Sequence, residues 1–272
     1  MKSIAFGQYY PADSVIHRLD PRAKVIMMIL YIVCSMVCKN IMAFGLLLIS
    51  ALTIVLLSKI PLKTILRSIR PILFIMLFTV VLNVFWTDGE SLLVEWGIIK
   101  IYLEGVYKAV FMMIRIVCMI VVTSIFLTYT TTPIALTDAL EQLLGPLKKI
   151  RVPVHEFTMM MTIALRFIPT LIEETDKIIA AQKARGADFS SGNLISRAKA
   201  LIPILIPLFV SAFRRADELA VAMECRCYRG GEGRTKLHVL RYGATDVVFM
   251  LGVVILGTAL ILLNIYGLGY TM

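Results

Sequence analysis

Five long apolar runs constrain this 272-residue chain more than any other feature, because a membrane-spanning helix needs about 20 mostly apolar residues. The runs are Val25–Cys38, Asn40–Ser58, Pro71–Thr87, Ala109–Tyr129 and 247–272. The composition agrees, since 59% of the residues are hydrophobic and only 17% are charged. A soluble chain carries about 25% charged residues. The sequence therefore predicts an all-α integral membrane protein with about five transmembrane helices, and it excludes disordered, collagen-like and secreted disulfide-rich classes.

Charged residues within or beside two of these runs need an explanation. Val25–Cys38 is short for a span, and it reaches sufficient length if Lys24 and Lys39 extend their ammonium groups to the two membrane interfaces. Arg115 interrupts the fourth run, and an arginine at the centre of a span costs about 2.5–3.5 kcal/mol. Because Arg115 lies near the outer end of its run, we expect snorkelling or a hydrogen bond within the bundle rather than contact with a substrate.

The loop charges predict the orientation of the spans. Residues 59–70 carry four basic side chains and no acid, whereas residues 88–104 carry four acids against Lys100 alone. Since cytoplasmic loops carry an excess of Lys and Arg, the first loop is expected inside and the second outside. The net charge of +10 fits the same rule. We predict a multi-pass cell-membrane protein with a cytoplasmic N-terminus, no cleaved signal peptide, and an outside C-terminus.

A charged insert separates the fourth and fifth runs, so we predict three segments. They are a membrane domain of four spans (1–130), a cytoplasmic coupling-helix domain (131–244) and a last transmembrane helix (245–272). Apolar residues recur in the insert at spacings of three and four, which is typical of amphipathic helices. The helices are expected over Ile134–Leu144, from Pro153 to Gly186, and from about Asn193 to about Tyr228.

The middle of the third insert helix is nearly as apolar as a span. Residues 200–213 are too short to cross a bilayer, they contain Pro203 and Pro207, and basic residues flank them. We expect the stretch to lie along the cytoplasmic membrane surface or under the spans, with a re-entrant segment as the alternative. An exposed apolar patch of this kind marks an interaction site. Its central residues are Ile202, Leu205, Ile206 and Phe209.

The second and third insert helices end alike, each with an arginine between two small residues. The tripeptides are Ala184-Arg185-Gly186 and Cys225-Arg226-Cys227, 41 positions apart. One arginine at a helix C-terminus is explained by the macrodipole. Two matched tips favour docking, because small flanks let a helix end enter a narrow groove and a guanidinium offers a fixed fork of donors to a carboxylate.

The sequence lacks the motifs of an energised enzyme. It has no phosphate-binding loop, no dinucleotide fingerprint and no zinc-protease or hydrolase signature. The three histidines are scattered and Cys225-x-Cys227 has no second ligand pair, so we expect free thiols, no metal and no cofactor. Membrane spans without an ATP-binding motif, together with two helix ends small enough to enter a groove, indicate a non-catalytic coupling subunit. ATP hydrolysis is then expected on another chain.

Four stretches resemble the transmembrane T component of energy-coupling factor transporters, the modular ABC-type importers of vitamins and metal ions. HRLDPRAK (17–24) is similar to the N-terminal signature of that family, and LRFIPTLIEETDKIIAAQKARG (165–186) is similar to its longest motif. AMECRCYRGG (222–231) resembles the second tip motif, although the family usually has Ala before the arginine and Gly or Ser after it. The terminal apolar span matches in position and length only.

The resemblance implies a membrane complex with three kinds of partner: two ATP-binding ATPase subunits, a membrane-embedded S component that binds the substrate, and the lipid bilayer. It implies that Arg185 and Arg226 each dock one ATPase, with Ala184, Gly186, Cys225 and Cys227 as flanks that fit the grooves. The S component is expected on the apolar face of Ile202, Leu205, Ile206 and Phe209. No nucleic acid is expected, and the resemblance leaves the transported vitamin or metal open.

Two other classes remain as alternatives. A membrane-embedded transferase could use Asp138, Glu141 and Arg166, but Arg166 lies on a different predicted helix from the two acids. A self-sufficient channel or secondary transporter should show ionisable groups in several spans, whereas Arg115 is the only charge within one. Activity of the purified single chain would favour either alternative.

Overall fold

The computed structural model of the chain describes residues 9–87, 92–96, 99–187, 193–230 and 239–266. It divides into two compact units. One combines Met1–Ala139 with Val239–Met272, and the other is Leu140–His238. The three segments predicted from the sequence, with boundaries at 130 and 244, stay a prediction. The end of the last apolar run, residues 267–272, lies outside the described residues.

The first unit holds the apolar helices. They are α1 (Pro21–Val37), α2 (Ile41–Ser58), α3 (Leu62–Ile69), α4 (Leu73–Trp86), α5 (Leu103–Thr123), which continues into a π-helical segment over Ser124–Tyr129, and α9 (Ala244–Ile265). Among the described residues, three helices are long and apolar enough to cross a membrane: α2, α5 with its π-helical end, and α9. The α3–α4 pair, bent by 60°, makes a fourth if it forms one span. The all-α membrane fold is confirmed. A fifth span through α1, which has 17 residues, stays a prediction.

One element was not predicted. The short strands β1 (Leu92–Trp96) and β2 (Ile99–Tyr102) pair antiparallel between α4 and α5, where the sequence indicated only an acidic outside loop. Glu95 lies opposite Lys100 in this register. Asp88 and Glu90 of the predicted acidic loop lie outside the described residues.

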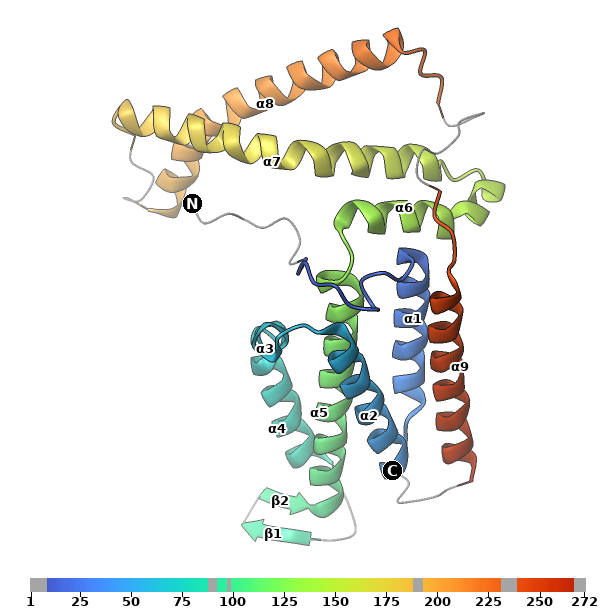
Figure 1. The fold of residues 1–272 in the computed structure, drawn as a ribbon. Coiled ribbons are helices and arrows are strands. Elements are labelled where there is room, and N and C mark those ends of the chain that lie inside the picture. Colours follow the sequence, from blue (N-terminus) through green and yellow to red (C-terminus); the bar gives the residue numbers. More distant parts are fainter. Residues whose placement is uncertain (1–8, 88–91, 97–98, 188–192, 231–238, 267–272) are drawn as a thin grey trace. The chain divides into compact units, whose positions relative to one another are not determined.

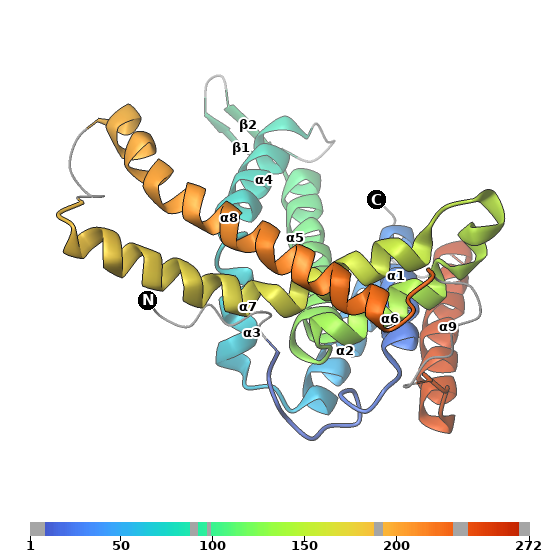
Figure 2. The same ribbon diagram turned by 90° about the horizontal axis from the view of Figure 1, so that it is seen from above.

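The core of the first unit lies between α1, α2, α5 and α9, which run side by side in both views (Figures 1 and 2). Its largest buried side chains are Tyr31, Tyr129, Phe126, Ile16, Met27, Leu47, Ile125 and Leu260. The helices α1 and α9 approach closely at Gly257, where an added Cβ would lie 2.8 Å from the Cys34 Sγ. A side chain at position 257 would therefore force the Cys34 side chain or the helices to shift.

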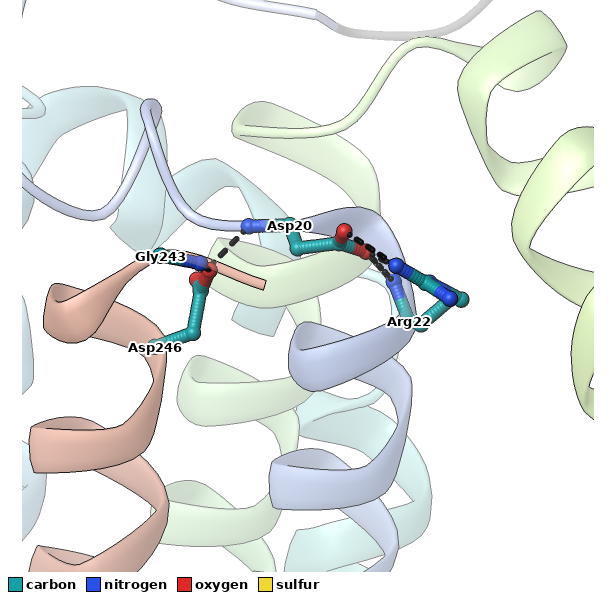
Figure 3. Close-up of polar contacts among 4 residues, drawn as sticks. All are labelled: Asp20, Arg22, Gly243 and Asp246. Carbon is teal, nitrogen blue, oxygen red and sulfur yellow. Dashed lines mark hydrogen bonds and ion pairs between the residues drawn. The ribbon is translucent and has the colours of Figure 1, made fainter. Parts of the chain in front are cut away.

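The N-terminal signature HRLDPRAK begins α1 and ties it to α9 (Figure 3). The Asp20 carboxylate caps α1 by accepting the Arg22 amide and is paired with the Arg22 guanidinium at 2.9 Å. The Asp20 amide donates to the buried Asp246 Oδ1 at 2.8 Å, and the Gly243 amide donates to Asp246 Oδ2 at 2.7 Å. Burial raises the pKa of the Asp20 carboxyl, but the hydrogen bonds from Arg22 outweigh burial and hold that pKa below its ordinary value.

Lys24 behaves differently from the expectation that its ammonium reaches the membrane interface. The side chain is buried, and its Nζ donates to the carbonyl of Thr130 at 2.7 Å and to that of His17 at 3.3 Å. Backbone carbonyls at the end of the π-helical segment thus replace water as its partners. A buried amine needs such acceptors, because its charge would otherwise be desolvated without compensation.

Arg115 forms a hydrogen bond within the helix bundle, which was one of the two arrangements expected from the sequence. Its Nη2 donates to the Cys38 carbonyl at 2.6 Å, and its guanidinium lies 5.2 Å from the centre of the Phe44 ring. The Cys38 carbonyl is available because α1 ends at Val37 and has no helical donor there. Arg115 therefore joins the end of α1 to α5.

The second unit contains the predicted insert helices. Helix α6 (Pro133–Leu143) leads into it, a 3₁₀ segment covers Gly145–Ile150, and the long helices α7 (Val154–Ala184) and α8 (Leu194–Cys225) follow. All three predicted helices are present, and each begins and ends within a few residues of its expected bounds. Helices α7 and α8 cross, and their C-terminal ends lie at opposite ends of the pair in both views (Figures 1 and 2).

Candidate functional site

The two predicted docking arginines occupy the same structural position. Arg185 is the C-cap of α7, and Arg226 is the C-cap of α8. After Arg185, the amides of Gly186 and Ala187 donate back to Lys183 and Gln182. After Arg226, the next two amides, of Cys227 and Tyr228, donate to the equivalent carbonyls. Both ends are Schellman motifs, which close a helix by turning the chain sharply after the C-cap.

The residue after each arginine has a left-handed backbone. Gly186 has φ +85° and Cys227 has φ +57°. Glycine adopts this conformation freely, whereas a side chain at the same φ costs about 1–2 kcal/mol. The residue after each arginine therefore determines the backbone turn, in addition to being small enough to enter the predicted groove. At the second tip this residue is Cys227, whose backbone is strained at positive φ.

All six predicted tip residues are exposed: Ala184, Arg185, Gly186, Cys225, Arg226 and Cys227. The second tip also borders a pocket of about 410 Å³. Arg226, Cys227 and Arg229 line it from the tip, and Met159 lines it from the first half of α7. The two guanidinium groups and the exposed backbone at this end are suited to an acidic partner surface.

Helices α7 and α8 are held together by polar contacts that the sequence reasoning missed. The Arg215 Nη2 donates to the Glu174 Oε2 at 2.5 Å, and the Gln182 Nε2 donates to the Pro203 carbonyl at 3.3 Å. The hydrogen bond from Arg215 lowers the pKa of the Glu174 carboxyl below its ordinary value. In the sequence, Glu173, Glu174 and Asp176 belong to a run of charged residues, and such a run does not indicate which of its members has a partner.

One signal could have found this ion pair. Glu174 and Arg215 are 41 positions apart, which is also the separation of the two tip arginines. The pair therefore joins equivalent positions of two helices that end in the same motif.

The predicted apolar face lies on one side of α8. Ile202, Leu205, Ile206 and Phe209 are 46–60% exposed, and Val210 and Phe213 extend the face with 64% and 68% exposure. These residues line an open groove of about 820 Å³. Side chains at spacings of three and four share one face of a helix. The structure thus brings the four predicted residues together on a single surface.

Two residues of the transferase alternative, Glu141 and Arg166, lie in the second unit. Glu141 on α6 contacts His155 Nδ1 at 3.0 Å, in a contact that the sequence did not suggest. Arg166 is exposed on α7. In the part of the chain that the structure describes, no group of three or more His, Cys, Asp or Glu side chains is placed to hold a metal ion. The cysteines are free thiols, three in the apolar helices and two at the second tip.

Residues 12–237 match the cobalt transport protein family CbiQ. The chain is 54% identical over 249 residues to the energy-coupling factor transporter transmembrane protein EcfT of Ruminiclostridium cellulolyticum, which covers 91% of this chain and 92% of that protein. It is 49% identical to EcfT of Clostridium kluyveri, with 98% of each chain covered. It is 45% identical to EcfT of Bacillus subtilis, with 97% of this chain and 99% of that protein covered. The chain therefore belongs to the EcfT family and is the multi-pass transmembrane (T) component of an energy-coupling factor transporter.

Proposed function

We propose that this T component binds two cytoplasmic ATPase subunits, one at Arg185 and one at Arg226, and couples their closure to an S component that carries a vitamin or a metal ion. The observation that supports this most directly is the repetition of one motif at two exposed helix ends. Both ends combine a C-cap arginine, a left-handed residue after it and a Schellman closure. Two helix ends with the same backbone structure are suited to bind two similar partner subunits.

Arginine suits this docking because of its geometry and charge. Its planar guanidinium binds a carboxylate through two parallel hydrogen bonds, whereas lysine offers only a point charge. A hydrogen bond to a charged partner contributes about 1.5–3 kcal/mol. Removing the guanidinium also leaves the partner carboxylate unpaired in its groove, so each tip should act as a hot spot of the interface.

The S component is assigned to the apolar face of α8 around Ile202, Leu205, Ile206 and Phe209. A continuous exposed apolar surface of this kind is expected to be covered by a partner or by lipid. The large side chains at its centre, Phe209 and Phe213, lie stacked with their ring centres 6.4 Å apart. Stacked aromatic rings form a broad, rigid contact surface at low entropic cost.

The proposed orientation places the N-terminus and the insert in the cytoplasm and the C-terminus outside, as the loop charges indicate. Hydrolysis of ATP is assigned to the partner ATPases, and this chain transmits movement without catalysing a reaction. When the ATPases close, the two seated arginines move with them, and α7 and α8 carry the movement to the S-component face.

Co-purification of the ATPases in mild detergent tests the tips. We expect the tagged wild type to bring down ATPase subunits, each of the single variants Arg185→Ala and Arg226→Ala to retain clearly less, and the double variant to lose them. Arg185→Lys should also weaken binding, because the charge remains but the bidentate geometry is lost. Arg166→Ala is the matched control, since Arg166 is an exposed arginine on α7 away from the tip.

The result contradicts the tip assignment if the double variant retains the ATPases as well as Arg166→Ala does. A wild-type chain that purifies alone would contradict ATPase coupling altogether. Crosslinks from Phe209 that reach only lipid in the assembled transporter would contradict the assignment of the S component to this face.

A further inference from the structure

The ion pair between α7 and α8 lies at the same distance from both tips. Arg185 lies eleven positions after Glu174, and Arg226 lies eleven positions after Arg215. Eleven helical residues rise about 16 Å. A contact between these two positions therefore lies at the same helical distance from both arginine tips.

The contacts on either side show that this point is the middle of the crossing. On one side, Gln182 in the last turns of α7 donates to the Pro203 carbonyl in the first half of α8. On the other side, Phe167 and Leu171 of α7 line a groove of about 570 Å³ with Leu219 and Met223 of α8. Glu174 and Arg215 lie between these contacts along both helices.

The pair is close but incompletely satisfied. The side chains of Arg215 and Glu174 keep 31% and 27% of their surface exposed, and their closest atoms are 2.5 Å apart. Arg215 uses Nη2 for this bond, while its buried Nε has no hydrogen-bond acceptor among the described residues. A buried donor without an acceptor is unfavourable. A bidentate pair, in which the second oxygen of Glu174 accepts from Nε, would satisfy this donor.

We propose that Glu174 and Arg215 are positioning residues that form the pivot of the crossed helices, about which the two tips move when the docked ATPases close. The proposal rests on the proposed function, because it assumes ATPases at both tips. A charged pair suits a pivot: it holds the two helices at one point, and it tolerates a change of angle better than interlocked apolar side chains. Closely packed cores, by contrast, shift between discrete states.

The test uses the full chain assembled with its ATPases in nanodiscs, with spin labels on non-natural residues at the exposed positions 176 and 217. These positions are equivalent on the two helices and follow the ion pair by two residues. The distance between the labels is measured without nucleotide and with ATP in the absence of Mg²⁺, so that hydrolysis does not occur. We expect ATP to shift this distance in the wild type.

Glu174→Gln and Arg215→Gln should each retain the ATPases within about twofold, because an ion pair this exposed contributes little to stability. Both should lose or broaden the ATP-dependent shift. The double variant Glu174→Arg/Arg215→Glu restores the opposite charges and should recover the shift. Glu173→Gln and Arg214→Gln are matched controls, since each removes the same charge from an exposed neighbouring residue, and both should behave as the wild type.

The possible outcomes distinguish a failure of the proposed pivot from a failure of the proposed ATPase docking. If the single variants bind ATPases and show the wild-type shift, or if the charge-swapped variant stays as impaired as the single ones, the pivot is wrong while the proposed function stands. If the wild type retains no ATPase, the proposed function fails and the pivot fails with it. A lower melting temperature of Glu174→Gln without loss of the shift would show a merely structural ion pair and would also overturn the pivot.

Discussion

The first unit and the α7–α8 pair use similar residues in opposite ways. In the first unit, apolar side chains of α1, α2, α5 and α9 form one buried core, and polar groups such as Lys24 and Asp246 are buried with hydrogen-bond partners. In the described part of α7 and α8, apolar side chains such as Phe209 and Phe213 are more than half exposed. The first unit therefore combines a buried core with exposed apolar faces such as those of Phe74 and Ile255, whereas few side chains are buried in the described part of α7 and α8.

This difference predicts where a substitution changes stability and where it changes binding. Within the first unit, a change of a single methyl group should alter the free energy of unfolding, because its interior is closely packed. On α7 and α8, even a large change should leave the isolated chain nearly as stable and should instead weaken assembly. The following predictions test this contrast in order of their expected effect on stability.

The largest effect is expected at the contact between α1 and α9. Gly257→Ala would place a Cβ 2.8 Å from the Cys34 Sγ, so the Cys34 side chain or the two helices must shift, at a cost of about 1–3 kcal/mol. Gly252→Ala on the same helix is the control, because nothing lies within 4 Å of its added Cβ. Thermal unfolding in detergent measures both. Adding Cys34→Ala should restore part of the loss, and equal melting temperatures for the two glycine variants would contradict the close contact.

A somewhat smaller loss is expected for Asp246→Ala. The substitution removes the acceptors of the Asp20 and Gly243 amides, and a lost hydrogen bond to a charged group costs about 1.5–3 kcal/mol before water compensates. The Asp20 amide is buried, but Gly243 is exposed and water can replace the carboxylate at its amide, so we expect a loss of about 1–2 kcal/mol in thermal unfolding. Asp217→Ala, an exposed acid on α8, should change stability by less than about 0.5 kcal/mol. The α1–α9 tie is wrong if both variants unfold alike.

The two tips should respond oppositely to substitution of the residue after the arginine. Gly186→Ala should destabilise the end of α7 by about 1 kcal/mol, because Ala is strained at positive φ. Cys227→Gly should stabilise the Schellman closure of α8 by about 0.5–1 kcal/mol, because it relieves that strain. Hydrogen exchange of the amides of Ala187 and Tyr228 reports each closure. Faster exchange at Tyr228 in Cys227→Gly would contradict the left-handed assignment.

The smallest effect on stability, and the largest on assembly, is expected at the apolar face. Phe209→Ser should change the melting temperature of the isolated chain very little, because the side chain is already 60% exposed. The same variant should lose co-purification of the S component. Phe126→Ser is the contrasting substitution in the buried core, where the side chain is 1% exposed, and it should unfold the chain. If Phe209→Ser destabilises the chain as strongly, the contrast between the two units fails.

Much of the fold follows from local patterns. Apolar runs of sufficient length predicted the spanning helices of the first unit, and spacings of three and four predicted α6, α7 and α8 close to their observed ends. The α1 helix was harder to predict as a span, because its apolar run is short and reaches sufficient length only if the Lys24 ammonium extends to the membrane interface. The β1–β2 ribbon was missed, since its short strands show no clear alternation of polar and apolar residues.

The residues of the candidate site also fall into two groups, those that local sequence patterns predict and those that they do not. The tip arginines and their small neighbours are recognisable because each tip is a continuous tripeptide at the end of a periodic helix. The Glu174–Arg215 and Glu141–His155 contacts were not predicted, because each joins residues on different helices. Helical spacing indicates which face a residue occupies, but it does not indicate which helix will pack against that face.

The sequence by itself determined that this chain is an all-helical membrane protein with two matched arginine tips, because hydrophobicity, helical periodicity and end signals act over a few consecutive residues. Only the tertiary structure decided that Lys24 is buried against the Thr130 carbonyl, that the Asp20 amide meets Asp246 across 226 positions of sequence, and that α7 and α8 are paired eleven residues before each tip. Such partners are chosen by how the helices pack, and packing depends on side chains from the whole chain at once.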